Sequence, residues 1–371
     1  MADIHMSFSP RIMTGSLSRI GSGVGNWGAH ALLLADTALE DVAADIQDQL
    51  DSWGVRTIQF SREGLGCDIL TLDDALSLAR GSHARGVVAL GGEGVMSLGR
   101  LVASAADSRL KADAVMENGV IPDNGLPLVE VPSSGTHSLM FLPRAFLADS
   151  VSGRSDLIGI SPPQTHVVVA DPTMPGRLTS GVSTLAAAVQ LAAATESFFS
   201  ARSNYLSDVQ SRAALKTASG LLRRVKDEYA DPDFRLAESE NSVLSALSTG
   251  LTGPGPALAL AWAVSSAARV SRAAALAVLL PWVLESPIYS GTPRAQAYCR
   301  LLADSDDDVS AGPADCVRDL FARISLPGRL RDLGADLDEV LSAATWAGTT
   351  MEKIRSDLNE SNFRDILEIA T

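Results

Sequence analysis

The distribution of apolar residues divides the chain into two parts. From about residue 10 to 172, short runs rich in β-branched and other apolar residues alternate with segments whose apolar residues recur at helical spacing. This alternation is typical of a parallel α/β sheet covered by helices. The predicted strands are Arg11–Met13, His30–Ala35, Thr57–Phe60, Gly86–Leu90, Leu128–Val131 and Thr165–Ala170, and the predicted helices are Ala38–Trp53, Asp73–Arg85 and Val95–Ala106.

After Asp171-Pro172 the pattern changes. The remainder is rich in Ala and Leu at helical spacing and has few clusters of β-branched residues, so we predict an all-helical second domain. Breaks fall at 251–256, at 286–293 and in the acidic segment 304–308. The predicted domains are 1–172 and 173–371, and the cleft between them is the expected place for a small-molecule site.

A glycine cluster follows the predicted strand that ends at Leu90. Gly91, Gly92 and Gly94 lead directly into a helix-like segment. Glycines let the backbone approach an anion closely, and the free N–H groups at a helix N-terminus attract it, so this turn predicts a phosphate cradle. Glu93 interrupts the cradle. Two like charges ~4 Å apart repel by about 4 kcal/mol at an effective dielectric near 20, which would spoil the site unless the side chain points away.

Composition narrows the class of protein. Of the 371 residues 46% are hydrophobic and 20% are charged, which is typical of an ordered soluble protein, and the net charge is -14. This charge argues against nucleic acid or an anionic membrane as a partner. The most apolar stretch, 257–284, is interrupted by two arginines and falls short of the ~20 uninterrupted apolar residues of a membrane span.

The cysteines and the amino terminus indicate in which cellular compartment we expect the protein. Cys67, Cys299 and Cys316 have no paired spacing, which favours a reducing compartment and argues against a disulfide framework or a Cys-based metal site. The first residues lack the basic and apolar regions of a signal peptide. We therefore expect a cytoplasmic protein.

Five short motifs occur in a characteristic order. They are Gly-Gly-Glu-Gly-Val-Met-Ser-Leu-Gly-Arg at 91–100, Val-Pro-Ser-Ser-Gly-Thr-His-Ser at 131–138, Asp-Pro at 171–172, the helical segment 181–190, and Leu-Leu-Pro-Trp at 279–282. With these motifs nearly the whole chain resembles the iron-containing alcohol dehydrogenase family, part of the dehydroquinate synthase-like superfamily. The resemblance implies a Rossmann-like N-terminal domain that binds a dinucleotide, an all-helical C-terminal domain, a small-molecule substrate and a homodimer.

The chain differs from this family where the resemblance implies metal ligands. In the family one Asp and three His hold a divalent metal that polarises the substrate oxygen. The Asp position is Ser183, the His positions are Ala187, Leu258 and Arg272, and that of a further active-site His is Trp262. Arginine keeps its proton, and Ala and Leu have no donor atom. All five His lie in the first domain. We therefore predict a metal-free member, most similar in the length of loop 131–138 to maleylacetate reductases.

The candidate catalytic residues come from these positions. Arg272 lies in an apolar helical stretch, where a guanidinium can anchor a substrate carboxylate or stabilise an enolate. Its alternative is a surface arginine that pairs with an acidic neighbour. Trp262 and Trp282 either line an aromatic cleft or fill the core. Ser183, at the position of the Asp, completes this set.

Loop 131–138 supplies a second group of candidates. Ser133, Ser134 and Ser138 are predicted to contact the cofactor, and His137 is a candidate proton donor. Alternatively, the hydroxyls donate to a bound phosphate or cap the following helix. A Ser–His nucleophile is poorly supported, because the sequence has no Gly-x-Ser-x-Gly elbow.

Two further residues bear on the cofactor. Asp36 closes a predicted strand, where an acidic side chain commonly binds the ribose hydroxyls and favours NAD(H) over NADP(H). Its alternative is to cap the helix that follows. Arg100 keeps the basic character of a lysine in the family's glycine motif and could offset the charge of Glu93.

These observations leave three hypotheses. The first is a metal-independent reductase of an activated carbonyl or enone, linked to NAD(H) or NADP(H), in which Arg272 orients the substrate and His137 or water supplies the proton. The second is a redox-neutral cyclase, isomerase or eliminase in a cleft lined by Trp262 and Trp282, where proximity and shape supply the catalysis. The third is a non-catalytic accessory protein.

Overall fold

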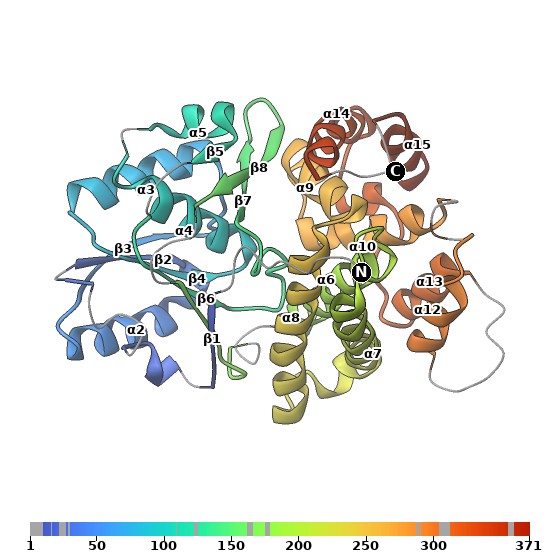
Figure 1. The fold of residues 1–371 in the computed structure, drawn as a ribbon, viewed down its shortest axis with the longest axis horizontal. Coiled ribbons are helices and arrows are strands. Elements are labelled where there is room, and N and C mark those ends of the chain that lie inside the picture. The colour runs from blue at the N-terminus through green and yellow to red at the C-terminus, as the bar shows by residue number, and fades with distance from the viewer. Residues whose placement is uncertain are drawn as a thin grey trace.

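The computed structural model describes residues 10–15, 17–21, 27–28, 30–108, 110–121, 125–161, 166–174, 179–286, 289, 291–303, 312–354 and 360–371. Figure 1 shows a sheet flanked by helices in the N-terminal part and a helical C-terminal part beside it. The predictions for residues 1–9, for Thr165 and for the acidic segment 304–308 fall outside the described residues.

Six parallel strands form the main sheet, and all six were predicted. Their order across the sheet is β1-β9-β6-β4-β2-β3. The strands are β1 (Arg11–Thr14), β2 (His30–Asp36), β3 (Arg56–Arg62), β4 (Val87–Gly91), β6 (Leu128–Pro132) and β9 (His166–Ala170). The central strands β2, β4 and β6 are buried along almost their whole length, which explains their continuous apolar runs.

The three helices predicted around this sheet form with shifted ends, whereas the short helix Ala112–Asn118 was not predicted. The helices are α2 (Glu40–Ser52), α3 (Ile69–Gly81), α4 (Glu93–Ala105) and α5 (Ala112–Asn118), with short 3-10 turns η1 (Leu17–Arg19) and η2 (Thr37–Leu39). The prediction for α3 was wrong by four residues at each end. Asp68 caps it early by accepting from the backbone N–H of Leu70, and the chain leaves the helix before His83, whose φ is 53°.

A second, three-stranded sheet was not predicted. It contains β5 (Val120–Ile121), β8 (Arg154–Ile160) and β7 (Arg144–Asp149) in that order, and β7 runs antiparallel to β8. The apolar run of β7 is only four residues long and lies between Arg144 and Asp149, so it gives a weaker signal than the central strands. In Figure 1 β7 and β8 lie at the junction of the two parts, where both pack against α9 (Pro256–Ala268).

The C-terminal part is all-helical in the described residues, as predicted. Besides α9 it contains α6 (Ser180–Phe199), α7 (Tyr205–Glu228), α8 (Pro232–Thr252), α10 (Arg272–Leu284), α12 (Ala295–Leu302), α13 (Pro313–Arg323), η4 (Leu330–Leu333), α14 (Leu337–Ile354) and α15 (Glu360–Ala370). By length and composition α6 is the one described helix that would suffice to cross a membrane, but 78% of its most apolar window is buried in the fold. Its apolar character is therefore explained by the core.

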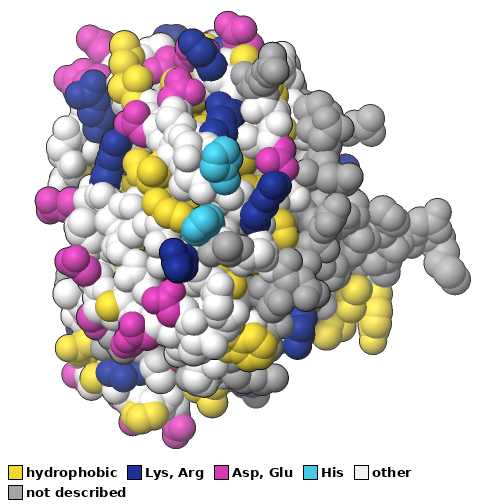
Figure 2. Space-filling view, turned by 90° about the vertical axis from the view of Figure 1, so that its left-hand side faces the viewer, with side chains coloured by type: hydrophobic (Ala, Val, Ile, Leu, Met, Phe, Trp, Pro, Cys, Tyr) yellow, Lys and Arg dark blue, Asp and Glu magenta, His cyan; other side chains and the backbone are white. Residues whose placement is uncertain are grey.

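The outer face of the α/β domain is mixed in charge. Figure 2 shows basic and acidic side chains interspersed over this face, with hydrophobic side chains in small groups between them. On the described part of this face the basic side chains do not gather into the patch that binding to a nucleic acid backbone requires.

A buried ionic cluster inside the α/β domain consists of Arg100, Glu130, His137 and His166. Arg100 on α4 binds the carboxylate of Glu130 on β6 with two bonds of 2.7 and 3.0 Å, and it also donates to four backbone carbonyls between residues 139 and 144. His166 lies 2.6 Å and His137 3.3 Å from the same carboxylate. Burial raises the pKa of Glu130, but Arg100 and the two imidazoles outweigh it and hold the pKa well below its ordinary value. Because these contacts occupy the guanidinium of Arg100, the prediction that Arg100 offsets the charge of Glu93 was wrong.

The cluster should make the fold sensitive to acid. Burial lowers the pKa of His166 below its ordinary value, although Glu130 opposes this shift. The unfolded chain therefore binds more protons as the pH falls below about 6.5, and stability is lost in that range, by about 1.4 kcal/mol for each unit between the two pKa values. Buried Glu196 and Glu238 have raised pKa values and change stability in the opposite direction over this range, so the contribution of His166 is measured as a difference between the wild type and a His166 variant in urea unfolding at pH 7.5 and 5.5.

The variant His166→Gln should lower stability at pH 7.5 and remove the loss on acidification that His166 contributes, so that the variant loses less stability than the wild type between pH 7.5 and 5.5. His83→Asn is the control, because His83 is exposed and should leave the slope unchanged. A slope in His166→Gln equal to that of the wild type would contradict this assignment.

Candidate active site

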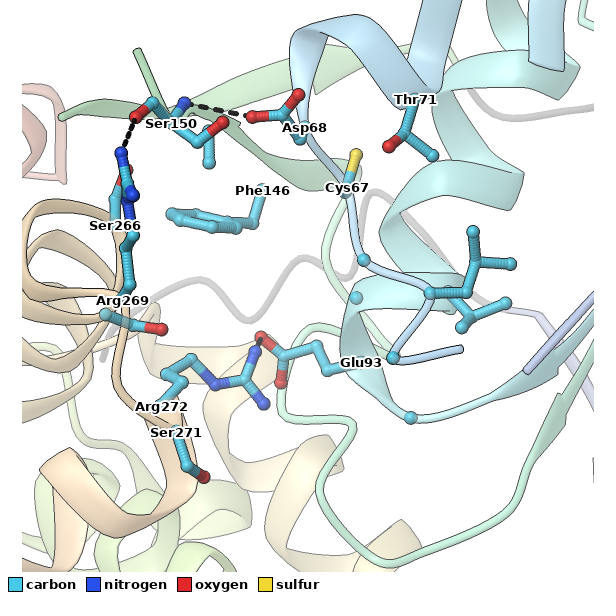
Figure 3. Close-up of a pocket in the computed structure, with 18 of the residues that line it drawn as sticks. Cys67, Asp68, Thr71, Glu93, Phe146, Ser150, Ser266, Arg269, Ser271 and Arg272 are labelled. Atoms are coloured by element: carbon cyan, nitrogen blue, oxygen red, sulfur yellow. Dashed lines mark hydrogen bonds and ion pairs between the residues drawn. The ribbon is translucent and has the colours of Figure 1, made fainter. Parts of the chain in front are cut away.

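A cavity of about 920 Å³ lies between the two parts of the chain (Figure 3). One wall consists of the loops that follow strands β2, β3 and β4, including segments 64–68 and 92–95. The opposite wall consists of β7 and segment 269–273, where α9 turns into α10. Because parallel strands deliver their carboxyl ends to one edge, this is the crevice in which open α/β sheets bind their ligands.

The predicted phosphate cradle forms part of the cavity wall. Gly92 is the N-cap residue of α4, and its position has no side-chain cap, so the first N–H groups of the helix are left for another acceptor. Gly92 and Gly94 both line the cavity. A Cβ on Gly94 would come within 3.1 Å of the Cα of Gly66, whereas a Cβ on Gly92 would meet nothing closer than 3.8 Å. The turn is therefore tight on one side and open toward the cavity on the other.

Glu93 does not obstruct this cradle. Its carboxylate is buried and forms an ion pair with Arg272 on α10. It also accepts from Trp262 Nε1 at 2.9 Å, and from the backbone N–H and the hydroxyl of Ser138 at 2.9 and 2.8 Å. In Figure 3 the carboxylate and the Arg272 guanidinium point toward each other across the cavity. The expected repulsion with a diphosphate is thus offset by an opposite charge from the other domain.

The two candidate tryptophans have different neighbours in the structure. Trp262 is 2% exposed and stacks on Phe146 with ring centroids 5.9 Å apart, and it is Phe146 that lines the cavity. Trp282 lies between Arg318 and Arg329, at 4.6 and 4.7 Å from their guanidinium carbons, beside a separate pocket of about 310 Å³ near α15. The predicted aromatic cleft lined by both tryptophans was therefore wrong.

A second polar connection crosses the rim of the cavity. Arg269, at the C-terminal end of α9, donates to the backbone carbonyl of Ser150 at 3.3 Å. The backbone N–H of Ser150 donates to Asp68 at 2.9 Å, and Figure 3 shows this chain of bonds along one side of the cavity. Sequence reasoning missed all three residues and Phe146, because no motif marks β7, the α9–α10 turn or the cap of α3.

Asp36 caps the turn after β2, which was the alternative to its predicted contact with a ribose. One carboxylate oxygen caps the turn after β2 by accepting from Ala38 N at 2.9 Å, and the other accepts from Leu65 N at 3.1 Å. Asp36 also lines the cavity, together with Arg62, its register partner on β3. Arg62 pairs with Asp74 at 2.6 Å. This end of the cavity therefore presents a carboxylate and a guanidinium side by side.

The polar side chains of loop 131–138 serve mainly to hold the loop. The Ser134 and Thr136 hydroxyls bond each other at 3.0 Å, and the backbone N–H of Ser133 donates to the carbonyl of Gly91, beneath the glycine turn, at 2.8 Å. Thr136 is the member of this loop that lines the cavity. His137 belongs to the buried Glu130 cluster, with Nε2 3.1 Å from Arg100, so the prediction that it donates a proton in the cavity is corrected.

Comparison with known proteins identifies the fold family. The family model "Iron-containing alcohol dehydrogenase" matches residues 10–172, and "Fe-containing alcohol dehydrogenase family, C-terminal" matches residues 186–370. The chain belongs to the iron-containing alcohol dehydrogenase family. Probable alcohol dehydrogenase EutG of Escherichia coli K12 is 24% identical over 349 residues, which are 92% of this chain and 86% of EutG.

Two solved structures of the family show how completely the fold is shared. The archaeal Red Sea brine pool alcohol dehydrogenase ADH/D1 superposes with a TM-score of 0.89 at 18% identity, covering 100% of both chains. Maleylacetate reductase from Agrobacterium tumefaciens superposes with a TM-score of 0.76 at 18% identity, covering 100% of this chain and 98% of its own. At these identities the similarity establishes the fold.

The residues at the family's metal positions do not fit a metal. Ser183 is fully buried with a hydroxyl that has no hydrogen-bond partner of good geometry, and Ala187 and Leu258 belong to the apolar core. Arg272 is paired with Glu93. In the part of the chain that the structure describes, no group of three His, Cys, Asp or Glu side chains is arranged to hold a metal ion.

The ion pair between Glu93 and Arg272 should be important for stability. The Glu93 side chain is fully buried and that of Arg272 is 15% exposed, so Arg272→Met would leave a carboxylate without its counter-charge. We expect a loss of about 3 kcal/mol in the free energy of unfolding. In Glu93→Gln/Arg272→Met the loss should be smaller than the sum of the two single losses, because each single change leaves an unpaired group.

The control is Arg318→Met, which breaks a pair with Glu285 in which both side chains are at least 33% exposed. It should cost less than about 1 kcal/mol. Equal losses in Arg272→Met and Arg318→Met would contradict the assigned importance of the buried pair.

Proposed function

We propose that this protein is an NAD(P)H-linked reductase of an activated carbonyl or enone that works without a divalent metal. The observation that carries the proposal is the uncapped N-terminus of α4, which faces a cavity of about 920 Å³ while the charge of Glu93 is neutralised by Arg272. Domains 1–172 and 173–371 would each contribute one wall of the site. Assembly as a homodimer stays a prediction.

The cradle fits the diphosphate of a dinucleotide. The N–H groups at the start of α4 would bind the phosphate oxygens, and the open side of Gly92 leaves room for them. Asp36 and Arg62 would meet the ribose, with Asp36 favouring NADH and Arg62 available to a 2′-phosphate. A reduced nicotinamide bound in this way supplies a hydride.

Arg272 is the residue we assign to the substrate. Its Nη1 donates to Glu93, its Nη2 lies 3.5 Å from the carbonyl of Thr136, and its Nε has no hydrogen-bond partner of good geometry. The guanidinium is therefore held in place at the cavity wall, and the N–H groups of its Nη atoms that Glu93 and Thr136 do not use would be the donors to the substrate, since Nε is buried. Because its net charge is already balanced by Glu93, it suits a neutral carbonyl oxygen better than a free carboxylate.

The redox-neutral alternative has lost the aromatic cleft in which its catalysis was expected. A cyclase or isomerase needed an aromatic cleft lined by Trp262 and Trp282, and Trp282 lies instead beside the pocket near α15. The family model and the relatives named above are alcohol dehydrogenases and a reductase, which supports oxidoreductase chemistry. A non-catalytic accessory role has no observation in its favour.

Calorimetric titration with NADH and NADPH tests the cofactor. We expect micromolar binding of NADH to the wild type and at least a tenfold loss in Gly92→Asp, because the new carboxylate would meet the diphosphate. Gly92→Ala is the steric control, since its Cβ has room, and should bind within about threefold of the wild type. No binding of either nucleotide at millimolar concentration would exclude the reductase proposal.

Metal removal tests the proposal that the enzyme works without a divalent metal. After dialysis against a chelator, reduction of an activated aldehyde by NADH should continue at the wild-type rate, since Ser183, Ala187, Leu258 and Arg272 offer no ligand set. Activity that disappears with the metal and returns with added Fe²⁺ or Zn²⁺ would refute metal independence.

A further inference from the structure

Among the described residues three arginines line the cavity, and they differ in how their charge is balanced. Arg62 and Arg272 each form an ion pair with a carboxylate, whereas Arg269 has no such partner in the described part of the chain. Within the same residues its guanidinium makes a single hydrogen bond, from Nη2 to the backbone carbonyl of Ser150 at 3.3 Å. A guanidinium has five N–H donors, so most of those of Arg269 are left for a ligand.

The acid across the cavity from Arg269 is occupied by the backbone. Asp68 lines the other wall, and its two carboxylate oxygens accept from the N–H groups of Leu70 and Ser150. It is connected to Arg269 only through the peptide group of Ser150. The whole chain has a net charge of -14, so the rim at Arg269 is a local positive site on an acidic protein. An anionic group of a ligand would find its counter-charge there.

The backbone at Arg269 is in a conformation that arginine does not favour. Its φ of 54° and ψ of 34° lie in the left-handed region, at the C-cap of α9. Glycine is the usual residue at such a position, because it has no Cβ. A positive charge near the end of a helix is favourable, but it does not require a side chain in the cavity. Retaining an arginine where glycine would be easier is consistent with a binding role.

Arg269 and Arg272 come from the same segment, the turn from α9 into α10. Figure 3 shows the side chain of Arg269 extended toward Ser150. That of Arg272 is directed toward Glu93, so the two guanidinium groups reach different parts of the cavity. The proposed function places the substrate carbonyl at Arg272, and a ligand that contacts both groups must carry its anion at a distance from this carbonyl. Phe146 on β7 lines the same wall and offers apolar surface to the carbons between them.

We propose that the substrate is an oxo acid, whose carboxylate is bound by Arg269 while Arg272 contacts the carbonyl oxygen. The inference rests on the proposed function, since it names the class of substrate that the same site reduces. Two N–H groups of Arg269 would form parallel hydrogen bonds to the carboxylate oxygens. A neutral carbonyl compound of the same size lacks this contact and is the poorer substrate.

The test compares kcat/KM for 4-oxobutanoate and 6-oxohexanoate with that for their methyl esters, with NADH as the reductant. The two acids differ in the reach between carboxylate and carbonyl. We expect the wild type to prefer at least one acid to its ester by tenfold or more, because hydrogen bonds between two charged groups are strong. In Arg269→Gly this ratio should fall to about one, mainly through KM. Glycine suits the left-handed backbone, so the melting temperature should not fall.

Two further variants separate a specific contact from a general effect of charge. Arg269→Lys keeps the charge without the planar fork, so its preference for the acid should lie between those of the wild type and Arg269→Gly. The matched control is Arg318→Gln, which removes one positive charge beside Trp282, away from the cavity. It should keep the wild-type ratio of acid to ester, whereas a general effect of net charge would lower the ratio in this variant as well.

Either of two results overturns the assignment while the proposed function stands. One is a wild type that reduces acids and esters with equal kcat/KM, and the other is a preference for the acid that is retained in Arg269→Gly. If the wild type neither binds NADH nor reduces any of the four compounds, the proposed function fails first and the assignment fails with it.

Discussion

The ion pair of Glu93 and Arg272 is the constraint on which the cavity depends. It joins the first residue of α4 to the first residue of α10, across 179 positions of sequence and between the two parts of the chain. Without it the glycine turn would carry an uncompensated negative charge at the place where an anionic ligand is expected. With it the carboxylate is drawn away toward Trp262 and Ser138, and the backbone of the turn is left to act alone. The same contact fixes how the two walls face each other.

Sequence reasoning succeeded where a residue's burial determines its type. The strands β2, β4 and β6 are buried on both faces, so their apolar runs were visible without any knowledge of their partners. It failed for β7 and β8, because β7 mixes buried and half-exposed positions and β8, although buried, begins with the polar residues Arg154, Ser155 and Asp156. The start of α3 was missed because a single capping side chain, that of Asp68, decides it.

The candidate site was only partly predictable, for a related reason. The glycine turn is a local feature, so Gly92 and Gly94 were found from their spacing. Whether Glu93 spoils that turn depends on a partner on a distant helix, and no local pattern reveals it. Trp282 and His137 were misplaced because a motif position fixes the backbone of a residue but not its neighbours, here Arg318 for the tryptophan and Glu130 for the histidine.

The two connections described across the cavity differ in strength, so the two ends of the cavity are not equivalent. At one end a desolvated ion pair holds Glu93 to Arg272, whereas at the other Arg269 contacts a single backbone carbonyl at 3.3 Å from an exposed position. Loss of the Arg269 contact breaks one ordinary hydrogen bond, whereas loss of the ion pair leaves two charges without partners, one of them fully buried. A ligand that enters past Arg269 and Ser150 would therefore disturb the weaker of the two contacts and leave the ion pair beside the glycine turn intact.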